Sequence, residues 1–181
     1  MKALVIGDMQ RWMFRTPDRS AQVTGLLSAI NRMTSVFLQD NLPIFSVVTE
    51  HKADKSTWSR LMLKHDYACM IEGSEDVQAV DGYREPSEAL RIVKRSNSAF
   101  LNTNFEQELK DRDVNHLILT GVFIDGCIGL TAADAAQRGF EVTFIEDAIG
   151  HTEKKWRGPL FDWLIDDYEI SVVKSEDYSS N

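Results

Sequence analysis

One of the two cysteines, Cys127, lies where an apolar run ends in a short turn and a helix rich in small residues is expected to begin. The start of a helix offers unpaired backbone N–H groups and the positive end of the helix dipole, and both favour a thiolate over a thiol. The sequence therefore indicates a nucleophile at Cys127. The alternative is a small apolar residue that packs in a tight turn, because free cysteines are commonly buried.

Two charged residues also end apolar runs that are typical of buried strands. Asp8 ends the run that opens the chain, and Lys94 ends the run over residues 89–94. Because the carboxyl ends of parallel strands face one crevice, we expect Asp8, Lys94 and Cys127 to converge. A carboxylate can then take the thiol proton while an ammonium stabilises the charges of both partners. Taken singly, Asp8 could be a capping or turn residue and Lys94 a solvated strand end.

The elements that position these residues alternate between strand-like runs and runs with helical spacing, which is the pattern of βαβ units. The fold class predicted is α/β: a doubly wound, mostly parallel six-stranded sheet with helices on both faces. Strands are expected over residues 2–8, 43–48, 89–94, 116–119, 140–145 and 169–173, and helices over 23–38, after 103, from 127 to 139 and near 156–164.

Three local patterns complete this prediction. Thr103 and Glu106 have the spacing of a capping box at the start of a helix. Residues 51–86 have weak periodicity and are expected to fold partly over the crevice. Residues 175–181 are expected to form a polar tail with little structure.

Composition favours one intracellular domain over residues 1–181. Two cysteines suit a reducing compartment, Cys69 is interpreted as structural, and we expect a cytoplasmic protein because neither a signal peptide nor a membrane-length apolar run is seen. The net charge of −8 without a basic stripe argues against nucleic acid as a partner. The glycines form neither a dinucleotide fingerprint nor a Walker pattern, so a nucleotide-binding or flavodoxin-like role is the weaker interpretation.

The motifs occur in three blocks, from Val5 to Phe14, from Lys94 to Thr103 and from Gly121 to Ala148. In this order they resemble the isochorismatase-like cysteine hydrolases, a family that includes nicotinamidases, N-carbamoylsarcosine amidase and ureidoacrylate and biuret amidohydrolases. The resemblance implies a triad with Asp8 as general base, Lys94 as electrostatic partner and Cys127 as nucleophile. It also implies a cis peptide bond between Val122 and Phe123, with the N–H groups of Phe123 and Cys127 forming an oxyanion hole.

Trp12, Phe14 and Asp125 are expected in the substrate pocket. The two aromatic residues are candidates for an apolar wall, although each could equally be core. Asp125 keeps the polar character that the family often has two places before the cysteine. One place earlier, Ile124 replaces a threonine common in the family, so substrate contacts through that threonine are not expected.

A second departure from the family lies after the second strand, where nicotinamidases carry an Asp-x-His…His metal cluster. Here the stretch offers Glu50, His51 and Asp54, with one histidine and two lysines. Two ammonium groups repel a cation, so a solvated loop is favoured over a divalent metal site. We therefore expect neither a metal nor another cofactor.

The function predicted is a metal-independent cysteine hydrolase that cleaves a C–N bond of a small amide or ureide through an acyl-thioester. A small-molecule substrate is the expected partner, with neither nucleic acid nor membrane, and a homo-oligomer is expected. Two alternatives stay open: cleavage of a vinyl ether with Asp8 as an acid, which needs no thiol, and a catalytically idle module on the same fold.

Overall fold

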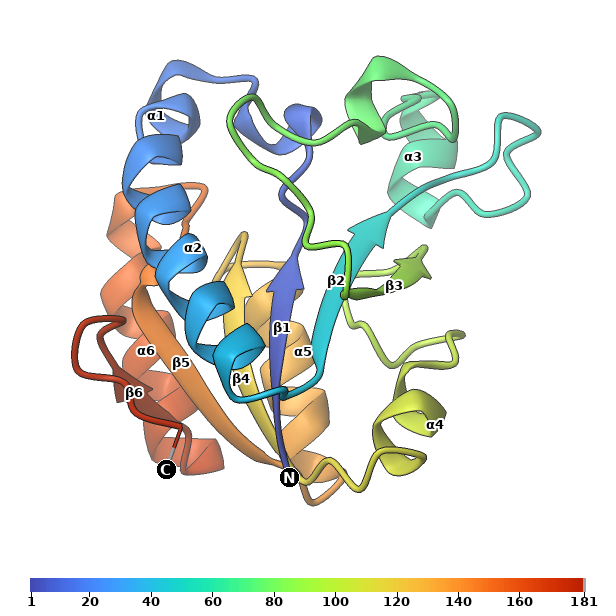
Figure 1. The fold of residues 1–181 in the computed structure, drawn as a ribbon. Helices are drawn as coiled ribbons and strands as arrows, with labels where there is room; N and C mark the ends of the chain where they lie inside the picture. Colours follow the sequence, from blue (N-terminus) through green and yellow to red (C-terminus); the bar gives the residue numbers. More distant parts are fainter. Residues whose placement is uncertain (181) are drawn as a thin grey trace.

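Six apolar runs form one parallel sheet in the order β3-β2-β1-β4-β5-β6 (Figure 1). The computed structural model describes residues 1–180. The strands are β1 (Lys2–Gly7), β2 (Ile44–Thr49), β3 (Leu90–Lys94), β4 (His116–Gly121), β5 (Glu141–Ile149) and β6 (Ser171–Val173). The predicted fold class is confirmed. The strand order reverses between β1 and β4, and in such sheets the ligand crevice lies at that point, outside the carboxyl ends of the strands.

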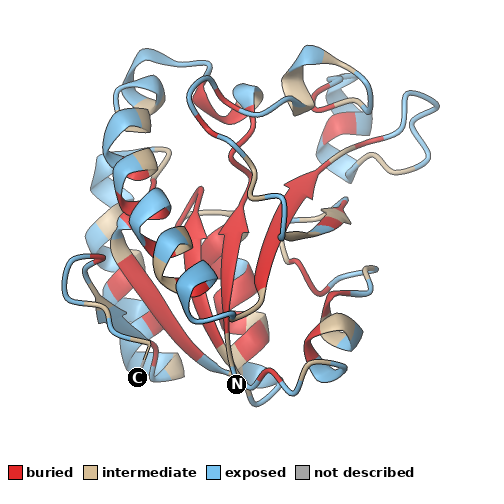
Figure 2. Ribbon diagram, in the orientation of Figure 1, coloured by how far each residue is buried: buried red, intermediate tan, exposed pale blue. Residues whose placement is uncertain are grey.

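Helices cover both faces of the sheet. They are α1 (Pro17–Ser20), α2 (Val23–Gln39), α3 (Arg60–His65), α4 (Phe105–Lys110), α5 (Cys127–Gln137) and α6 (Lys154–Tyr168), with 3₁₀ turns η1 (Arg11–Phe14) and η2 (Glu75–Val77). Alternate strand residues face opposite cores: Leu4 and Ile6 pack with the residues of α2, whereas Ala3 and Val5 pack with those of α4, α5 and α6. Figure 2 shows the resulting pattern, with buried strands between helices whose outer surfaces are exposed.

Helix α4 begins differently from the prediction. Its N-cap is Asn104 rather than Thr103, so the predicted capping box does not form. The Glu106 carboxylate instead pairs with the Arg138 guanidinium at 2.5 Å. The expectation was wrong because two cations hold the Glu106 carboxylate, Lys110 one turn later in α4 and Arg138 at the end of α5. The contact with Arg138 is one that a local pattern does not reveal.

The two irregular segments also have defined places. The segment 51–86 packs against the residues that follow β1, where the Arg11 N–H donates to the Gln78 carbonyl at 2.9 Å and the Val80 N–H donates to the Met9 carbonyl at 3.0 Å. Residues 175–180 form a turn but no helix or strand, as expected for a tail with little structure, yet side-chain contacts described in the Discussion hold them against the fold. Residue 181 lies outside the described residues. Within residues 1–180, no helix has both the length and the apolar character that crossing a bilayer requires.

Candidate active site

The ends of three neighbouring strands place three polar side chains together. Asp8 follows β1 directly and has a left-handed backbone with φ of 52°. Thr49 ends β2 and Lys94 ends β3, and these two residues are partners in the strand register. Asp8, Thr49 and Lys94 are all buried. The sheet register therefore fixes their relative positions before any side-chain interaction is considered.

The Lys94 ammonium lies at the centre of the site. Its Nζ is 2.9 Å from Asp8 Oδ2, and it donates to Thr49 Oγ1 at 2.6 Å, to the Ser96 carbonyl at 3.1 Å and to Cys127 Sγ at 3.1 Å. The Thr49 hydroxyl donates in turn to Asp8 Oδ1 at 2.8 Å. The structure thus brings together the three residues predicted as a triad, and it adds Thr49, which links two of them.

Cys127 is the first residue of α5, as the sequence predicts. The turn that precedes Cys127 is held by the carbonyl of Phe123. The N–H groups of Gly126 and Ile128 both donate to this carbonyl oxygen, at 3.0 and 3.1 Å. The predicted cis peptide bond between Val122 and Phe123 is present. Among the described residues, the N–H groups of Phe123 and Cys127 have no hydrogen-bond acceptor.

The pKa of Cys127 is shifted in the direction opposite to the one that a helix start favours. Burial raises the pKa of Cys127 to about 12, and the Asp8 carboxylate raises it too, while the Lys94 ammonium lowers it without compensating. Burial also lowers the pKa of Lys94, but Asp8 and Cys127 outweigh that effect, so the net pKa of Lys94 is raised. Burial and the Asp8 carboxylate therefore both favour the protonated form of Cys127. The helix start alone does not produce a thiolate, and a base must remove the proton.

The residues expected to line the substrate pocket occupy three different environments. Phe14 is buried with its ring edge-on to Phe123, at 6.2 Å between ring centroids. Trp12 is partly buried and lies under the Arg15 guanidinium, at 3.9 Å from its ring centroid. The Asp125 carboxylate accepts hydrogen bonds from the N–H and the hydroxyl of Thr152. Contact of Phe14, Trp12 and Asp125 with a substrate stays a prediction.

The side chains considered for a metal have other partners. Glu50 pairs with Arg91 at 2.7 Å, and Asp54 accepts two hydrogen bonds from Ser56. His51 Nδ1 lies 2.9 Å from the Thr57 carbonyl. No group of three or more potential histidine, cysteine or carboxylate ligands gathers within residues 1–180. Glu50 and Asp54 are therefore poorly placed as ligands, and independence from metal stays a prediction.

Two interactions outside the predicted triad hold the segments next to it in place. The Gln10 side chain forms a pair of hydrogen bonds with the backbone of Thr49, each at 2.9 Å, and its amide also donates to the Val77 carbonyl at 3.2 Å. The Asp134 carboxylate accepts from the Ser98 hydroxyl at 2.6 Å and so ties α5 to the segment after Lys94.

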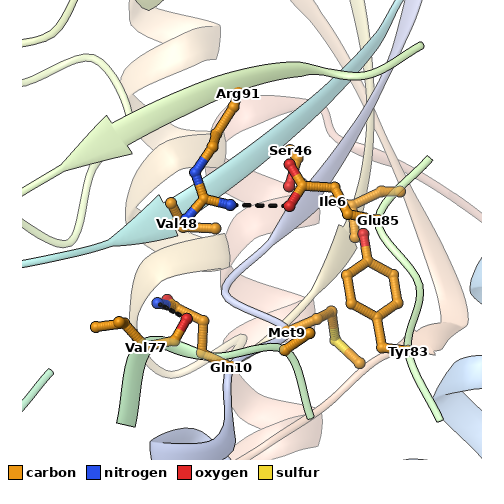
Figure 3. Close-up of a pocket in the computed structure, with 10 residues that line it drawn as sticks. Ile6, Met9, Gln10, Ser46, Val48, Val77, Tyr83, Glu85 and Arg91 are labelled. Atoms are coloured by element: carbon orange, nitrogen blue, oxygen red, sulfur yellow. Dashed lines mark hydrogen bonds and ion pairs between the residues drawn. The ribbon is translucent and has the colours of Figure 1, made fainter. Parts of the chain in front are cut away.

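Two small cavities flank this network. One of about 10 Å³ lies against Asp8, Lys94 and Cys127. The other, of about 20 Å³, lies behind Gln10 and beside the ion pair of Arg91 with Glu85 (Figure 3). Cavities of this size hold about one water molecule at most, so neither accommodates a substrate.

Comparisons with known proteins show the family to which the chain belongs. The sequence matches the isochorismatase domain family over residues 2–157. It is 30% identical over 156 residues to a protein of Arabidopsis thaliana named a probable inactive nicotinamidase, over 81% of this chain and 79% of that protein. Enterobactin synthase component B of Escherichia coli is 28% identical over 150 residues, which cover 81% of this chain and 52% of the larger protein.

A solved structure shows the same fold over the whole chain. N-carbamoylsarcosine amidase from Thermoplasma acidophilum has a TM-score of 0.84 to this protein at 22% sequence identity, with 99% of each chain covered. The family match extends from β1 past the turn that carries Cys127, and so includes every strand end of the site. The chain therefore belongs to the isochorismatase family.

Proposed function

We propose that this protein is a cysteine hydrolase that cleaves the C–N bond of a small amide or ureide without a metal ion. The observation that carries the proposal is the contact of one buried ammonium, Lys94 Nζ, with both Cys127 Sγ at 3.1 Å and Asp8 Oδ2 at 2.9 Å. A nucleophile, its base and a charge that stabilises both are what acyl transfer requires. The similarity in fold to an N-carbamoylsarcosine amidase supports this reaction class.

The reaction starts from the thiol. Asp8 accepts the Cys127 proton, and the Lys94 ammonium stabilises the thiolate as it attacks the substrate carbonyl carbon. The carbonyl oxygen becomes an oxyanion, for which the N–H groups of Phe123 and Cys127 are the proposed donors, since neither has another acceptor among the described residues.

Protons then return to the leaving group. The tetrahedral intermediate collapses, the C–N bond breaks, and the proton held by Asp8 passes to the nitrogen, which leaves as ammonia or an amine. Water attacks the resulting thioester and gives its proton to Asp8, and the carboxylic acid leaves as Cys127 recovers that proton. One carboxylate thus serves both half-reactions, and each step is balanced in protons.

The first prediction concerns the thiol itself. Cys127→Ala and Cys127→Ser should each reduce ammonia release from a panel of small amides and ureides by at least about 10³-fold, because the covalent step is lost. Cys69→Ser is the matched control, since Cys69 is the second free cysteine and lies outside the site. Circular dichroism should show an unchanged fold in all three variants. Ammonia release that persists in Cys127→Ala would remove the covalent mechanism, because C–N hydrolysis would then need no thiol.

A further inference from the structure

Asn97 places an amide group beside the proposed nucleophile. Cys127 Sγ donates to Asn97 Oδ1 at 3.8 Å. The Asn97 side chain is exposed, whereas Asp8 and Lys94 are buried. A molecule bound at the thiol can therefore contact Asn97, which takes no part in the proton transfers to and from Asp8.

The chain is fixed on both sides of Asn97. On one side the Ser96 carbonyl accepts from Lys94 Nζ at 3.1 Å. On the other side the Ser98 hydroxyl donates to the Asp134 carboxylate at 2.6 Å. Asp134 lies on α5, the helix that begins with the nucleophile. The segment that carries Asn97 is therefore tied both to the ammonium of the site and to the helix of the thiol.

The Asn97 amide itself is left free to bind another group. Within residues 1–180 it forms no hydrogen bond besides the one from the thiol. The amide of Asn104, in contrast, donates to Glu108 at 3.0 Å. A side-chain amide has an oxygen with two lone pairs and two N–H donors, so most of the capacity of Asn97 is unused. A fixed backbone and a free polar side chain at the nucleophile are features of a substrate-binding residue.

The two sides of an amide substrate require different partners. The proposed donors to the carbonyl oxygen, the N–H groups of Phe123 and Cys127, belong to the turn before α5 and to its first residue, whereas Asn97 belongs to the segment after β3. The oxygen and the nitrogen of an amide point away from each other on the same carbon. When the oxygen faces the two N–H groups, the nitrogen therefore faces elsewhere, and its N–H needs an acceptor.

We propose that Asn97 Oδ1 accepts a hydrogen bond from the N–H of the scissile nitrogen, so that Asn97 is a specificity-determining residue that favours amides over esters of the same shape. The inference rests on the proposed function and deepens it. Transfer of the thiol proton to Asp8 removes the S–H donor from Oδ1, which the substrate N–H then replaces. A site built to bind an N–H discriminates against an analogue without it, because the acceptor is left unpaired.

The test compares an amide reagent with the corresponding ester. In a Cys69→Ser background, Cys127 is alkylated with iodoacetamide or with methyl iodoacetate, which has no N–H, and each rate is divided by the rate for glutathione. The amide-to-ester ratio should fall by about five- to tenfold in Asn97→Leu, which keeps the approximate size of the side chain but removes the acceptor. Asn97→Asp keeps an acceptor and should keep the ratio. Asn31→Leu is the matched control, because Asn31 is an exposed asparagine on α2, and it should leave the ratio unchanged.

Turnover gives the same comparison for the reaction itself. The amide of the panel that is hydrolysed fastest is compared with its methyl ester, and the ratio of the two kcat/KM values should fall by a similar factor in Asn97→Leu. A merely structural role would lower both values together and leave their ratio unchanged.

The outcomes separate this inference from the proposed function. An amide-to-ester ratio that is unchanged in Asn97→Leu, or that falls equally in Asn31→Leu, would overturn the role of Asn97. Failure of the proposed function has a different signature, which is ammonia release that survives Cys127→Ala or a panel in which no amide is hydrolysed. The alkylation ratio needs no turnover and decides the role of Asn97 in that case too.

Discussion

Thr49 is the residue on which the alignment of the site depends. Its hydroxyl accepts from Lys94 and donates to Asp8, so it uses both of its hydrogen-bonding capacities within the site. The Gln10 side chain fixes the Thr49 backbone from the other side. Thr49 contacts no reacting atom, and we interpret it as a positioning residue that holds the base and the ammonium at a fixed separation.

Substituting Thr49 tests this role. Thr49→Val keeps the shape of the side chain but leaves two buried charged groups short of a partner, so kcat should fall by about 10²-fold, the loss expected from a misplaced catalytic group. Thr49→Ser keeps the hydroxyl and should restore most of the activity. KM should change little in either variant. Equal activity of the valine and serine variants would show that the hydroxyl has no positioning role.

We expect Asp8 to have two opposite effects on the Cys127 thiol: it suppresses the thiolate in the resting protein and removes the thiol proton during turnover. Because the Asp8 carboxylate raises the pKa of Cys127, Asp8→Asn should lower this pKa and increase the thiolate fraction at pH 8, while turnover is lost with the base. Iodoacetamide should therefore alkylate the variant faster than the parent protein. In the parent, with a pKa of about 12, the rate should rise by about tenfold per pH unit between pH 8 and 10.

The alkylation is measured in a Cys69→Ser background so that only Cys127 reacts, and labelling is followed by mass spectrometry. The direction of the change decides the matter: a slower reaction in Asp8→Asn would mean that the carboxylate promotes the thiolate in the resting protein. That result would contradict the role of Asp8 as a base acting on a protonated thiol.

The sequence reveals the triad but not its electrostatics. Asp8, Lys94 and Cys127 are recognisable because each stands at the end of an apolar run, and strand ends in a parallel sheet meet. Thr49 also ends such a run. It is uncharged and is followed by charged residues, so the sequence does not single it out as part of the site. The pKa of Cys127 depends on burial and on a carboxylate more than a hundred residues away, which no local pattern contains.

At the scale of elements, the site requires β1 and β4 to approach closely where they end. Gly7 and Gly121 are register partners, and Gly121 has a φ of 106°. A Cβ atom at position 121 would lie 2.1 Å from the Gly7 carbonyl oxygen. The turn that leads to Cys127 therefore begins at a position where only glycine fits, directly beside the strand that delivers Asp8.

Gly121→Ala should destabilise the fold by at least about 2 kcal/mol, since both the left-handed backbone and the clash oppose it. Urea denaturation followed by circular dichroism measures this loss. Gly25→Ala is the matched control: Gly25 lies in α2 with open space around the added methyl group, so this substitution should stabilise the protein by about 0.5–1 kcal/mol. Equal stability of the two variants would contradict the close approach of β1 and β4.

The spacing of apolar residues predicts which helices and strands form better than it predicts where they end. All six expected strands form, because continuous apolar runs of this length are what a sheet buried on both faces requires. Strand β5 extends to Ile149, beyond the expected residue 145. Its pairing with β4 contains a register shift between Leu119 and Gly121 of β4. Such an irregularity arises from pairing between strands, and a single run of residues does not show it.

At the scale of the whole molecule, the C-terminal segment joins parts of the fold that are distant in sequence. Ser175 donates to the Asp147 carboxylate of β5 through its N–H at 2.8 Å and its hydroxyl at 2.6 Å. The Tyr178 ring stacks on Phe37 of α2 at 5.9 Å, and the Lys2 ammonium lies over the same ring at 5.9 Å. The polar composition of this segment suggests a free tail, but an aromatic ring, a capped turn and hydrogen bonds of Ser180 with Lys2 and Asp40 dock it.

Because Lys2 begins β1, the docked tail lies at the amino end of this strand, the end away from Asp8 (Figure 1). Tyr178→Ala should therefore lower stability without changing kcat or KM. Loss of the ring contacts should cost about 1–2 kcal/mol, or about 2–8 °C in Tm for a chain of this length.

Tyr178→Phe is the matched control, because the Tyr178 hydroxyl is buried without a hydrogen-bond partner among the described residues. The phenylalanine variant should be at least as stable as the parent, since it keeps the stacking on Phe37 and removes an unsatisfied polar atom. Differential scanning calorimetry and ammonia-release kinetics on the same preparations give both readouts. A fall in kcat in Tyr178→Ala at unchanged stability would mean that the tail is coupled to the site across the sheet rather than bracing the opposite end of it.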